Sequence, residues 1–449
     1  MQEGPVKDDK IKQNAPALSR PPMELSSEVT YALDILEHSR KCVFISGRAG
    51  TGKSTLLQLF RSTSRKRIAV VAPTGVAALN VSGQTIHSFF RFPPRLLDAN
   101  DIVKVRNRRL YKNLEVLVVD EISMVRADMF DNMDIFLRVN RESSEPFGGV
   151  RVIVFGDLFQ LPPVVANEFE KRYLADRYKT PYFFSSRAYK SIMHEMETIE
   201  LNTVYRQSER HFINILDQIR SKSIDWDDLE DLNNRVLGED EEVQHGSITL
   251  TTRNDTAQQI NKDKLKEIEE QGLHFHAIVR GQFDPKIYPT DVSLLLKKGA
   301  QVMTLKNDPQ RRYVNGSIGH IIDIDIDHLV LEIVDDKDNA HRIELEKATW
   351  EMIKYKWNAE KKTVESDVIG SFEQYPLKLA WAMTIHKSQG KTFEKVYIDM
   401  AGGAFEFGQT YVALSRCKTL GGVQLKQPLT PRDIMVDERI IGFYDYWRR

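Results

Sequence analysis

A glycine-rich octapeptide constrains this chain more than any other segment, because it lies between a strand-like run and a helix-like run. It reads Gly47-Arg48-Ala49-Gly50-Thr51-Gly52-Lys53-Ser54 and continues into Thr55, with the apolar run Cys42 to Ile45 before it and helical apolar spacing to Phe60 after it. In this context the glycines let backbone N–H groups turn toward a phosphate, Lys53 reaches the β- and γ-phosphates, and the Ser54 hydroxyl ligates Mg²⁺. A glycine-rich turn that binds nothing is the alternative, and it explains neither flank. The sequence therefore predicts a nucleoside triphosphate site of the P-loop type.

Length and composition indicate an ordinary globular protein of several domains. The chain has 449 residues, of which 41% are hydrophobic and 28% are charged, and domains average about 150 residues. It contains no apolar run near the roughly 20 residues of a membrane helix, and its beginning lacks a signal-peptide core. The two cysteines, Cys42 and Cys417, are too few for a disulfide framework or a four-ligand zinc site. We therefore expect no membrane partner and a reducing compartment, either the bacterial cytosol and nucleoid or a nucleus.

Charge is balanced overall but separated along the sequence. The formal net charge is −1, which by itself does not indicate a nucleic-acid partner. Basic residues nevertheless cluster over 61–67, 104–112 and 306–312, and acidic residues cluster over 225–231. Such runs often form solvated faces. Separation of sign is also what a protein with one basic groove requires.

Alternation of strand-like and helix-like segments predicts two α/β domains with parallel sheets. Four β-branched apolar runs occur in the first, at 42–46, 68–73, 114–121 and 150–156, and three in the second, at 248–252, 395–399 and 422–425. Short β-like runs between turns at 301–305, 318–324 and 329–334 predict a small antiparallel barrel inserted into the second domain. We expect a disordered tail over 1–22, a first domain over 23–190, a second over 191–299 and 375–449, and the barrel over 300–374.

Polar residues follow two of the predicted strands where the site of a P-loop enzyme is expected. Asp120 and Glu121 end the run that begins at Leu114, and Gln160 follows the run that ends at Gly156. Asp120 is predicted to hold Mg²⁺ together with Ser54, and Glu121 to polarise the attacking water. A helix cap is the alternative for the acid pair when it is taken alone. Gln160 is expected to hydrogen-bond the γ-phosphate or that water.

Taken in order, the motifs resemble those of Pif-type (petite integration frequency) DNA helicases, in the 5′-to-3′ branch of helicase superfamily 1 that also holds the RecD proteins. The matching segments run from Gly47 to about Cys417 and are 72–78, 83–89, 203–207, 384–390 and 411–416. A segment similar to the signature that separates Pif-type enzymes from RecD relatives lies between the acid pair and Gly156. It contains Asp131 to Asp134, Arg138 to Arg141 and Pro146 to Gly149.

The resemblance implies two RecA-like domains, a strand-separating wedge at about 90–112 and a Src-homology-3-like barrel with Val314 to Ser317 as a turn. It implies an enzyme that uses ATP and Mg²⁺ to unwind tailed duplexes, quadruplexes or RNA–DNA hybrids in genome maintenance, with a monomer as the expected state. Arg206 and Arg416 would face the γ-phosphate from the second domain, and Gly390 would belong to the nucleotide site. An arginine in that position neutralises transition-state charge. Surface salt bridges are the alternative for both arginines.

The resemblance also implies a groove for single-stranded DNA. Its residues combine backbone amides, hydroxyls and imidazoles that suit phosphate oxygens with two rings, Phe89 and Phe159, for stacking on bases. They are Pro73, Thr74, Gly75, Val76, Thr85, His87, Ser88, Phe89, Phe159, Asn254, Thr384, His386, Lys387 and Ser388. Asn261 is a further candidate. Core packing is the alternative for each ring.

One departure and two other functions bear on this interpretation. The segment from Leu25 to Val29 lacks the glutamine with which relatives read adenine, so it does not predict strict ATP specificity. A RecD-like or relaxase-associated helicase is an alternative that Pro146 to Gly149 disfavours. A non-unwinding ATPase switch is another, which Arg206, Arg416 and the strand-contacting motifs disfavour.

Overall fold

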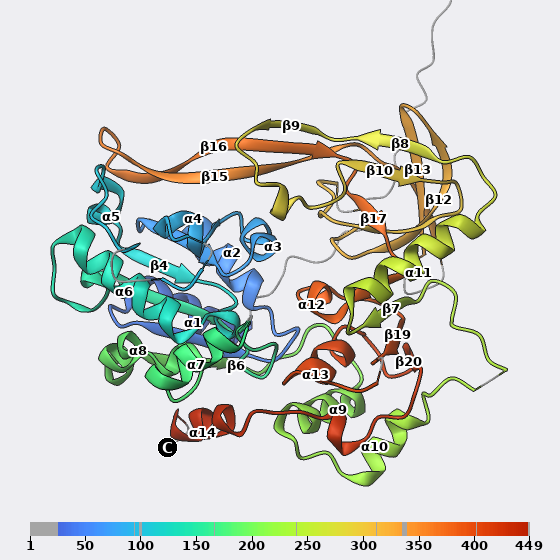
Figure 1. The fold of residues 1–449 in the computed structure, drawn as a ribbon, viewed down its shortest axis with the longest axis horizontal. Coiled ribbons are helices and arrows are strands. Elements are labelled where there is room, and N and C mark those ends of the chain that lie inside the picture. The colour runs from blue at the N-terminus through green and yellow to red at the C-terminus, as the bar shows by residue number, and fades with distance from the viewer. Residues whose placement is uncertain are drawn as a thin grey trace, which may run out of the picture.

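Three bodies make up the computed structural model, two α/β domains and a β insert that lies beside both (Figure 1). The structure describes residues 26–93, 95–97, 101–165, 167–238, 240–310, 312–334, 339–400 and 402–447. The tail predicted over 1–22 and Arg311 of the third basic cluster lie outside the described residues. Among the described helices, none is long and apolar enough to cross a membrane.

The first domain is built on a parallel sheet that, within the described residues, has six strands in the order β3-β2-β4-β5-β1-β6. These strands are β1 (Val43–Gly47), β2 (Ile68–Ala72), β3 (Gln84–Thr85), β4 (Val116–Val119), β5 (Arg151–Gly156) and β6 (Glu197–Leu201). Val43 and Ile45 pack on one face with α1 (Ser27–His38) and α2 (Lys53–Thr63), whereas Phe44 packs on the other with α6 (Ala127–Arg141). Because all strands are parallel, the loops after β1, β4 and β5 meet at one edge.

Short helices complete this domain. They are α3 (Gly75–Asn80), α4 (Ile86–Phe90), α5 (Arg109–Asn113), α7 (Glu168–Arg177), α8 (Arg187–Ile192), η2 (Ile122–Met124), η3 (Pro146–Gly149), η4 (Phe183–Ser185) and η5 (Met193–Glu195). The segment predicted as a wedge, 90–112, is described in part, and its aromatic residues Phe90, Phe92 and Tyr111 pack edge-on against Phe136 of α6. Its basic residues are partly neutralised, because Lys104, Arg108 and Lys112 all pair with Glu142.

The second domain has, in the described part of the chain, four parallel strands in the order β18-β7-β19-β20. They are β7 (Ile248–Thr251), β18 (Ala382–Thr384), β19 (Val396–Asp399) and β20 (Val423–Leu425). Its helices are α9 (Arg210–Ser221), α10 (Trp226–Asn233), α11 (Asn254–Glu267), α12 (Ile385–Ser388), α13 (Gln409–Leu414) and η7 (Pro431–Asp433). The two α/β sheets confirm the predicted fold class.

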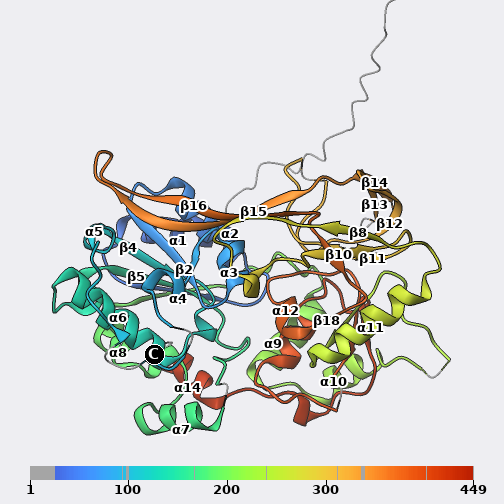
Figure 2. The same cartoon turned by 45° about the horizontal axis from the view of Figure 1, so that its top comes forward.

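The β insert is antiparallel and reaches over the first domain. Its strands are β8 (Leu273–His276), β9 (Ile278–Gly281), β10 (Ser293–Leu296), β11 (Gln301–Thr304), β12 (Ile318–Asp325), β13 (His328–Val334), β14 (Ala340–Glu344), β15 (Ala348–Asn358), β16 (Thr363–Gln374) and β17 (Leu377–Leu379), with η6 (Pro285–Ile287) before β10. As far as the structure describes the insert, β14-β13-β12-β11-β17 form a five-stranded sheet. The β15–β16 ribbon extends from it across the first domain in both views (Figures 1 and 2). There the Tyr355 hydroxyl accepts a hydrogen bond from Val70 N at 3.2 Å, and Tyr355 N donates to Gln84 Oε1 at 3.1 Å.

Strand pairing and packing move three of the predicted domain boundaries. β6 pairs with β1 and so belongs to the first sheet, although residue 191 was the predicted start of the second domain. The insert begins before residue 300, since β9 pairs with β16, and it continues past 374, since β17 pairs with β11.

The last helix, α14 (Glu438–Trp447), returns from the second domain to the first. Its Tyr444 hydroxyl lies 2.6 Å from Ser46 Oγ, and the Phe443 ring stacks on Phe184 with ring centroids 4.5 Å apart. Trp447 Nε1 donates to the Tyr189 hydroxyl at 2.9 Å. The prediction that the second domain includes everything up to 449 is therefore wrong for this helix, because its apolar face completes the core of the first domain.

The segment similar to the Pif-type signature, from α6 through η3, serves the framework of the first domain. The backbone of η3 is left-handed at Phe147, Gly148 and Gly149, with φ of 51°, 61° and 77°. Asp134 Oδ1 accepts a hydrogen bond from Phe147 N at 2.5 Å, and Asp131 accepts from Tyr178 and from Ala188 N. We conclude that these carboxylates hold an unusual turn and its neighbours in place.

Candidate functional site

The phosphate loop folds tightly between β1 and α2. Gly50 and Gly52 both have φ of 84°, a region that favours glycine. A Cβ at Gly50 would lie 2.6 Å from the Cβ of Arg206, so close approach also requires glycine there. Lys53 Nζ donates to the carbonyl oxygens of Gly47 at 2.6 Å and Arg48 at 2.8 Å. The loop residues Gly47 to Thr55 thus lie together, with Ser54 and Thr55 exposed at the start of α2.

The acid pair follows β4 beside this loop. Glu121 has a left-handed backbone with φ of 51°, which turns the chain sharply after the strand. Burial, and then the neighbouring Glu121, raise the pKa of Asp120 to about 7. Burial also raises the pKa of Glu121, and nearby Lys53 opposes that rise. Two buried carboxylates beside an exposed Ser54 hydroxyl are hard oxygen donors that fit a divalent cation such as Mg²⁺.

Two arginines from beyond the first sheet converge on the loop. Tyr205 N donates to Gly50 O at 2.9 Å, which fixes the segment that carries Arg206, and Arg206 Nη1 donates to Ser415 O at 3.0 Å. Arg416 is almost completely buried and donates to Val412 O at 3.0 Å.

The cationic groups of the site lie close enough to disturb one another. Burial, and then Arg416, lower the pKa of Arg206 to about 9, while burial lowers that of Arg416 to about 10. Burial also lowers the pKa of Lys53, against the pull of Asp157 and Glu121. Like charges held together in this way favour a polyanionic ligand.

Sequence reasoning missed a junction around Asp157, at the end of β5. The Asp157 carboxylate accepts hydrogen bonds from Arg220 Nη2 at 3.1 Å, from the Tyr411 hydroxyl at 3.3 Å and from Gln160 Nε2 at 3.3 Å. The Tyr411 hydroxyl accepts from Ala49 N of the phosphate loop at 3.0 Å. Arg220 and Tyr411 belong to the second domain, so this junction joins both domains to the loop. Tyr411 lies in a segment matched to the family, 411–416, whereas Arg220 had no sequence signal.

Gln389 is a second residue that sequence reasoning passed over. Its Nε2 donates to Glu121 Oε2 at 3.1 Å and to Gln160 Oε1 at 3.3 Å. It lies between Ser388, which was predicted to contact DNA, and Gly390, which was predicted for the nucleotide site and has a φ of 78°. Its place in a matched motif could have suggested a role.

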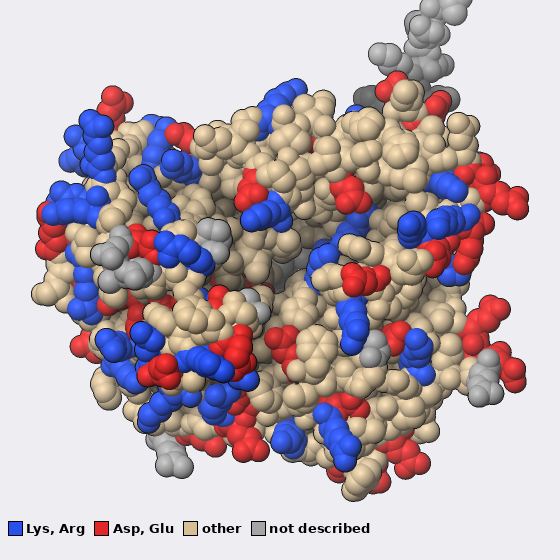
Figure 3. Space-filling view, viewed as in Figure 1, with Lys and Arg blue, Asp and Glu red and all other residues tan. Residues whose placement is uncertain are grey.

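The predicted DNA-contacting threonines start three short helices. Thr74, Thr85 and Thr384 accept hydrogen bonds from Ala77 N, Ser88 N and Lys387 N, and so cap α3, α4 and α12. Capping satisfies backbone N–H groups that a helix leaves free. Val76, Ser88 and Lys387 are exposed on these helices, and Pro73, His87 and His386 are half-buried. Figure 3 shows a recess between the two α/β domains near α3 and α12, with Lys and Arg side chains at its rim.

Several DNA-contact predictions do not fit the structure. Phe89 is buried and packs edge-on against Phe90, Tyr111 and Tyr355. Phe159 is buried, stacks on Tyr444 at 5.2 Å and lies under the Arg220 guanidinium. Neither ring is open to a base, because aromatic partners from distant segments cover both.

Two further polar candidates have structural partners. Ser388 is fully buried and donates to Ile385 O. Asn261 is occupied by the backbone of β18, donating to Ala382 O and accepting from Trp381 N. Asn254 is exposed at the start of α11 and stays a prediction. Gly75 lies against the insert, since a Cβ there would be 2.2 Å from Ile287 Cγ2.

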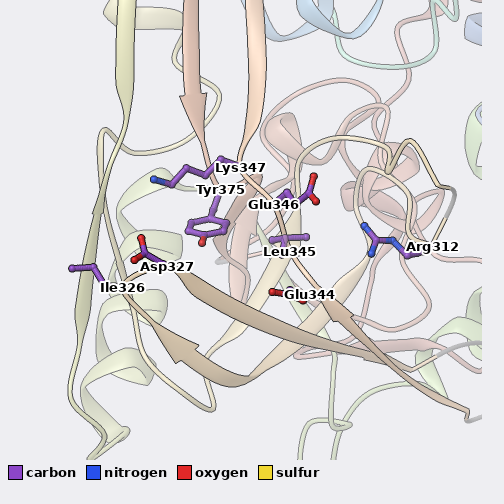
Figure 4. A pocket seen from close by; sticks show the side chains of 8 residues that line it. All are labelled: Arg312, Ile326, Asp327, Glu344, Leu345, Glu346, Lys347 and Tyr375. Carbon is purple, nitrogen blue, oxygen red and sulfur yellow. The ribbon is translucent and has the colours of Figure 1, made fainter. Parts of the chain in front are cut away.

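A cavity of about 450 Å³ lies in the β insert, apart from these residues (Figure 4). It is lined by charged groups of both signs, with Lys347 and Asp327 on the side of Tyr375, Arg312 at the other end, and Glu344 and Glu346 between them. None of the nucleotide-site residues lines it.

Comparison with known proteins places these features in one family. The model of the PIF1-like helicase family matches residues 27–230. The ATP-dependent DNA helicase Pif1 of Bdellovibrio bacteriovorus is 34% identical over 94% of this chain and 92% of its own length. The ATP-dependent DNA helicase PIF1 of Danio rerio is also 34% identical, but this chain spans only 64% of it.

Solved structures agree with the sequence relatives. The Bacteroides sp Pif1 complex with ADP-AlF4 superposes with a TM-score of 0.87 at 35% identity, over 95% of this chain and 98% of that one. The Bacteroides Pif1 bound to ssDNA covers the same shares at 35% identity, but with a TM-score of 0.67. The arrangement of the present chain is therefore more similar to that of the ADP-AlF4 complex than to that of the protein bound to ssDNA.

Proposed function

The chain belongs to the PIF1-like helicase family and is an ATP-dependent DNA helicase, and on that premise we propose that it moves 5′ to 3′ along single-stranded DNA and unwinds the duplex ahead. The observation that carries the proposal is the convergence of Lys53 from the first domain with Arg206 and Arg416 from beyond its sheet. Cations on both sides of the cleft between the two α/β domains are suited to binding a triphosphate. Binding and hydrolysis of that triphosphate would then close and open the cleft.

Each residue of the site takes one role in this mechanism. Lys53 and the loop N–H groups bind the phosphates, Ser54 and Asp120 hold Mg²⁺, and Glu121 accepts the proton of the attacking water, which Gln160 orients. Arg206 and Arg416 neutralise charge as it develops on the γ-phosphate. Mg²⁺, when bound, supplies further neutralisation of the phosphate oxygens.

The junction at Asp157 gives the site a route to movement. Arg220 and Tyr411 grip this carboxylate from the second domain, while Tyr411 also holds Ala49 of the phosphate loop. A change in the loop on ATP binding is therefore transmitted to α9 and α13. Alternating grip on the strand by the two domains converts that change into stepping.

We assign the DNA path to the recess between the α/β domains. Ser88 and Lys387, which are exposed on α4 and α12, supply a hydroxyl and a cation for phosphate oxygens, and Val76 of α3 is exposed beside them. The structure of Bacteroides Pif1 bound to ssDNA superposes less well on this chain, with a TM-score of 0.67. In the present structure, Ile287 of the insert lies against Gly75 of α3. We infer that the insert moves away from α3 when a strand enters.

The remaining assignments follow from a DNA substrate. We propose that the protein acts as a monomer on tailed duplexes, quadruplexes and RNA–DNA hybrids, in the bacterial cytosol or a nucleus. Two other functions are the alternatives. A RecD-like helicase shares the polarity, whereas an ATPase switch hydrolyses ATP on DNA without displacing a strand.

A strand-displacement assay on two duplexes that differ only in tail polarity tests the proposal. With ATP and Mg²⁺, the 5′-tailed duplex should be unwound and the 3′-tailed duplex should not. Unwinding of the 3′-tailed duplex alone would refute the direction. DNA-stimulated hydrolysis with no displacement on either duplex would support the switch instead, and chelation of Mg²⁺ should stop hydrolysis in every case.

A further inference from the structure

The side-chain amide of Gln389 lies between the two residues assigned to the attacking water. It comes from the second domain, directly after α12, whereas Glu121 and Gln160 follow β4 and β5 of the first. Its Nε2 donates one hydrogen bond to Glu121 Oε2 at 3.1 Å and one to Gln160 Oε1 at 3.3 Å. Both partners are thus engaged by a single group that crosses the domain boundary.

An amide in this position imitates the water that hydrolysis requires. The NH₂ group of a glutamine offers two hydrogens, and an attacking water offers the same two, one to its base and one to the group that orients it. While Gln389 donates to both, a water would have to displace its N–H groups to donate along the same two directions.

We propose that Gln389 holds Glu121 and Gln160 out of use in the DNA-free protein and releases them when a strand binds at α12. This inference rests on the proposed function, since it takes the roles of Glu121 and of α12 from there. Gln389 is a positioning residue in this scheme, because it acts on the reaction through Glu121.

The fold supplies a mechanical link between α12 and Gln389. The helix is a single turn closed at both ends, since Thr384 accepts from Lys387 N, Ser388 Oγ donates to Ile385 O at 2.7 Å, and Gln389 N donates to His386 O at 3.3 Å. Its exposed side chain is Lys387. A displacement of this short rigid turn by a DNA phosphate therefore carries Gln389 with it.

The residue after Gln389 allows such a displacement. Gly390 has a φ of 78°, and a Cβ there would meet nothing within 4 Å. No neighbouring side chain crowds this glycine, but Arg416 Nη1 donates to Ser388 O at 3.5 Å and to Lys391 O at 3.3 Å, on either side of it. A displacement of Gln389 therefore also changes the contacts of a predicted catalytic arginine.

A neighbouring glutamine shows what a structural contact looks like at this interface. Gln207 Nε2 donates to the backbone oxygens of Ser415 and Cys417, both fixed parts of the second domain. Gln389 instead bonds two side chains with assigned chemistry.

The test replaces Gln389 by methionine, which keeps the length and removes both donors. ATP hydrolysis is measured without DNA and with saturating oligo(dT). Without DNA, kcat of Gln389→Met should rise about tenfold, the effect of one lost charge-assisted hydrogen bond, with KM for ATP unchanged within about twofold. With DNA, kcat should stay within about twofold of the parent, so the stimulation ratio falls about tenfold. Gln259→Met is the matched control, because Gln259 is an exposed glutamine of the same domain that bonds Asp263.

Two outcomes would overturn the inference. If kcat without DNA is unchanged, Gln389 does not restrain Glu121; if kcat falls equally with and without DNA, Gln389 takes part in hydrolysis itself. Gln389→Ala repeats the test should the methionine variant fail to fold. Glu121→Gln distinguishes failure of the proposed function from failure of the restraint. If Glu121→Gln still hydrolyses ATP, the role proposed for Glu121 is wrong. If Glu121→Gln is inactive and Gln389→Met hydrolyses ATP at the parent rate without DNA, only the restraint by Gln389 is wrong.

Discussion

The nucleotide cleft and the α6–η3 segment both carry dense family motifs, yet they satisfy their polar groups in opposite ways. In α6–η3, buried carboxylates such as Asp134 meet donors from the same domain. In the cleft, Arg206 and Arg416 lie close enough that burial and mutual repulsion lower the pKa of Arg206. The paired charges of α6–η3 stabilise the fold. The like charges held together in the cleft instead favour binding of a ligand of opposite charge.

Arg206→Ala tests the cleft side of this comparison with the largest expected effect. Loss of a cation at the γ-phosphate should lower kcat for DNA-stimulated hydrolysis by about 10⁴-fold. The melting temperature should be unchanged or higher, because a buried positive charge beside Arg416 is removed. Arg206→Lys is the control and should recover part of the rate, since it restores the charge without the planar fork. A large loss of stability in Arg206→Ala would assign Arg206 to the framework.

Lys53→Ala should lower kcat by about 10³-fold, since it removes one donor to developing phosphate charge. Affinity for single-stranded DNA, measured by fluorescence anisotropy, should remain within a few-fold, because other residues form the recess. Substantial turnover in a clean preparation would contradict the assignment of the phosphate site.

Asp134→Ala tests the α6–η3 segment, the other region of the comparison. The variant leaves Phe147 N without an acceptor in a left-handed turn, and the free energy of unfolding should fall by about 3 kcal/mol. The folded fraction should hydrolyse ATP at a kcat within about twofold of the parent. Asp176→Ala, an exposed aspartate of α7, is the control with little expected change. Parent-like stability with a large loss of kcat would reverse the comparison.

Arg138→Ala sharpens the comparison with the smallest effect. Arg138 pairs with Asp134 at 2.9 Å, but its side chain is 35% exposed. Urea denaturation should show a loss of about 1 kcal/mol or less, as is usual for exposed ion pairs. A loss as large as that of Asp134→Ala would mean that the ion pair, and not the bond to Phe147 N, stabilises the turn.

The parts of the site that sequence could predict are those that depend on local chain. Asp120 and Glu121 follow β4 directly, Lys53 follows β1 after the short phosphate loop, and parallel strands bring their ends to one edge. The strands at 43–47, 116–119 and 248–251 were predicted within a few residues for the same reason. Local pattern determines these positions with no knowledge of distant partners.

The parts that sequence could not predict depend on contacts between remote segments. Arg220 reaches Asp157 across 63 residues and Tyr411 reaches it across 254. Phe159 was wrongly assigned to bases because Tyr444, which covers it, lies in a helix predicted to belong to the other domain. The same long reach explains the shifted boundaries at β6, which pairs with β1, and at β9, which pairs with β16.

The return of α14 to the first domain has a consequence for synthesis of the protein. The hydroxyl oxygens of Ser46 and Tyr444 lie 2.6 Å apart, although the two residues are separated by 398 positions in the sequence. A ribosome adding about 5–20 residues per second takes about 20–80 s to span that interval. Throughout it, the nascent first domain presents Phe184, the ring on which Phe443 will stack, without its cover. The first domain is thus translated first and completed last. A premature stop before Glu438 leaves the apolar surface around Phe184 open to aggregation.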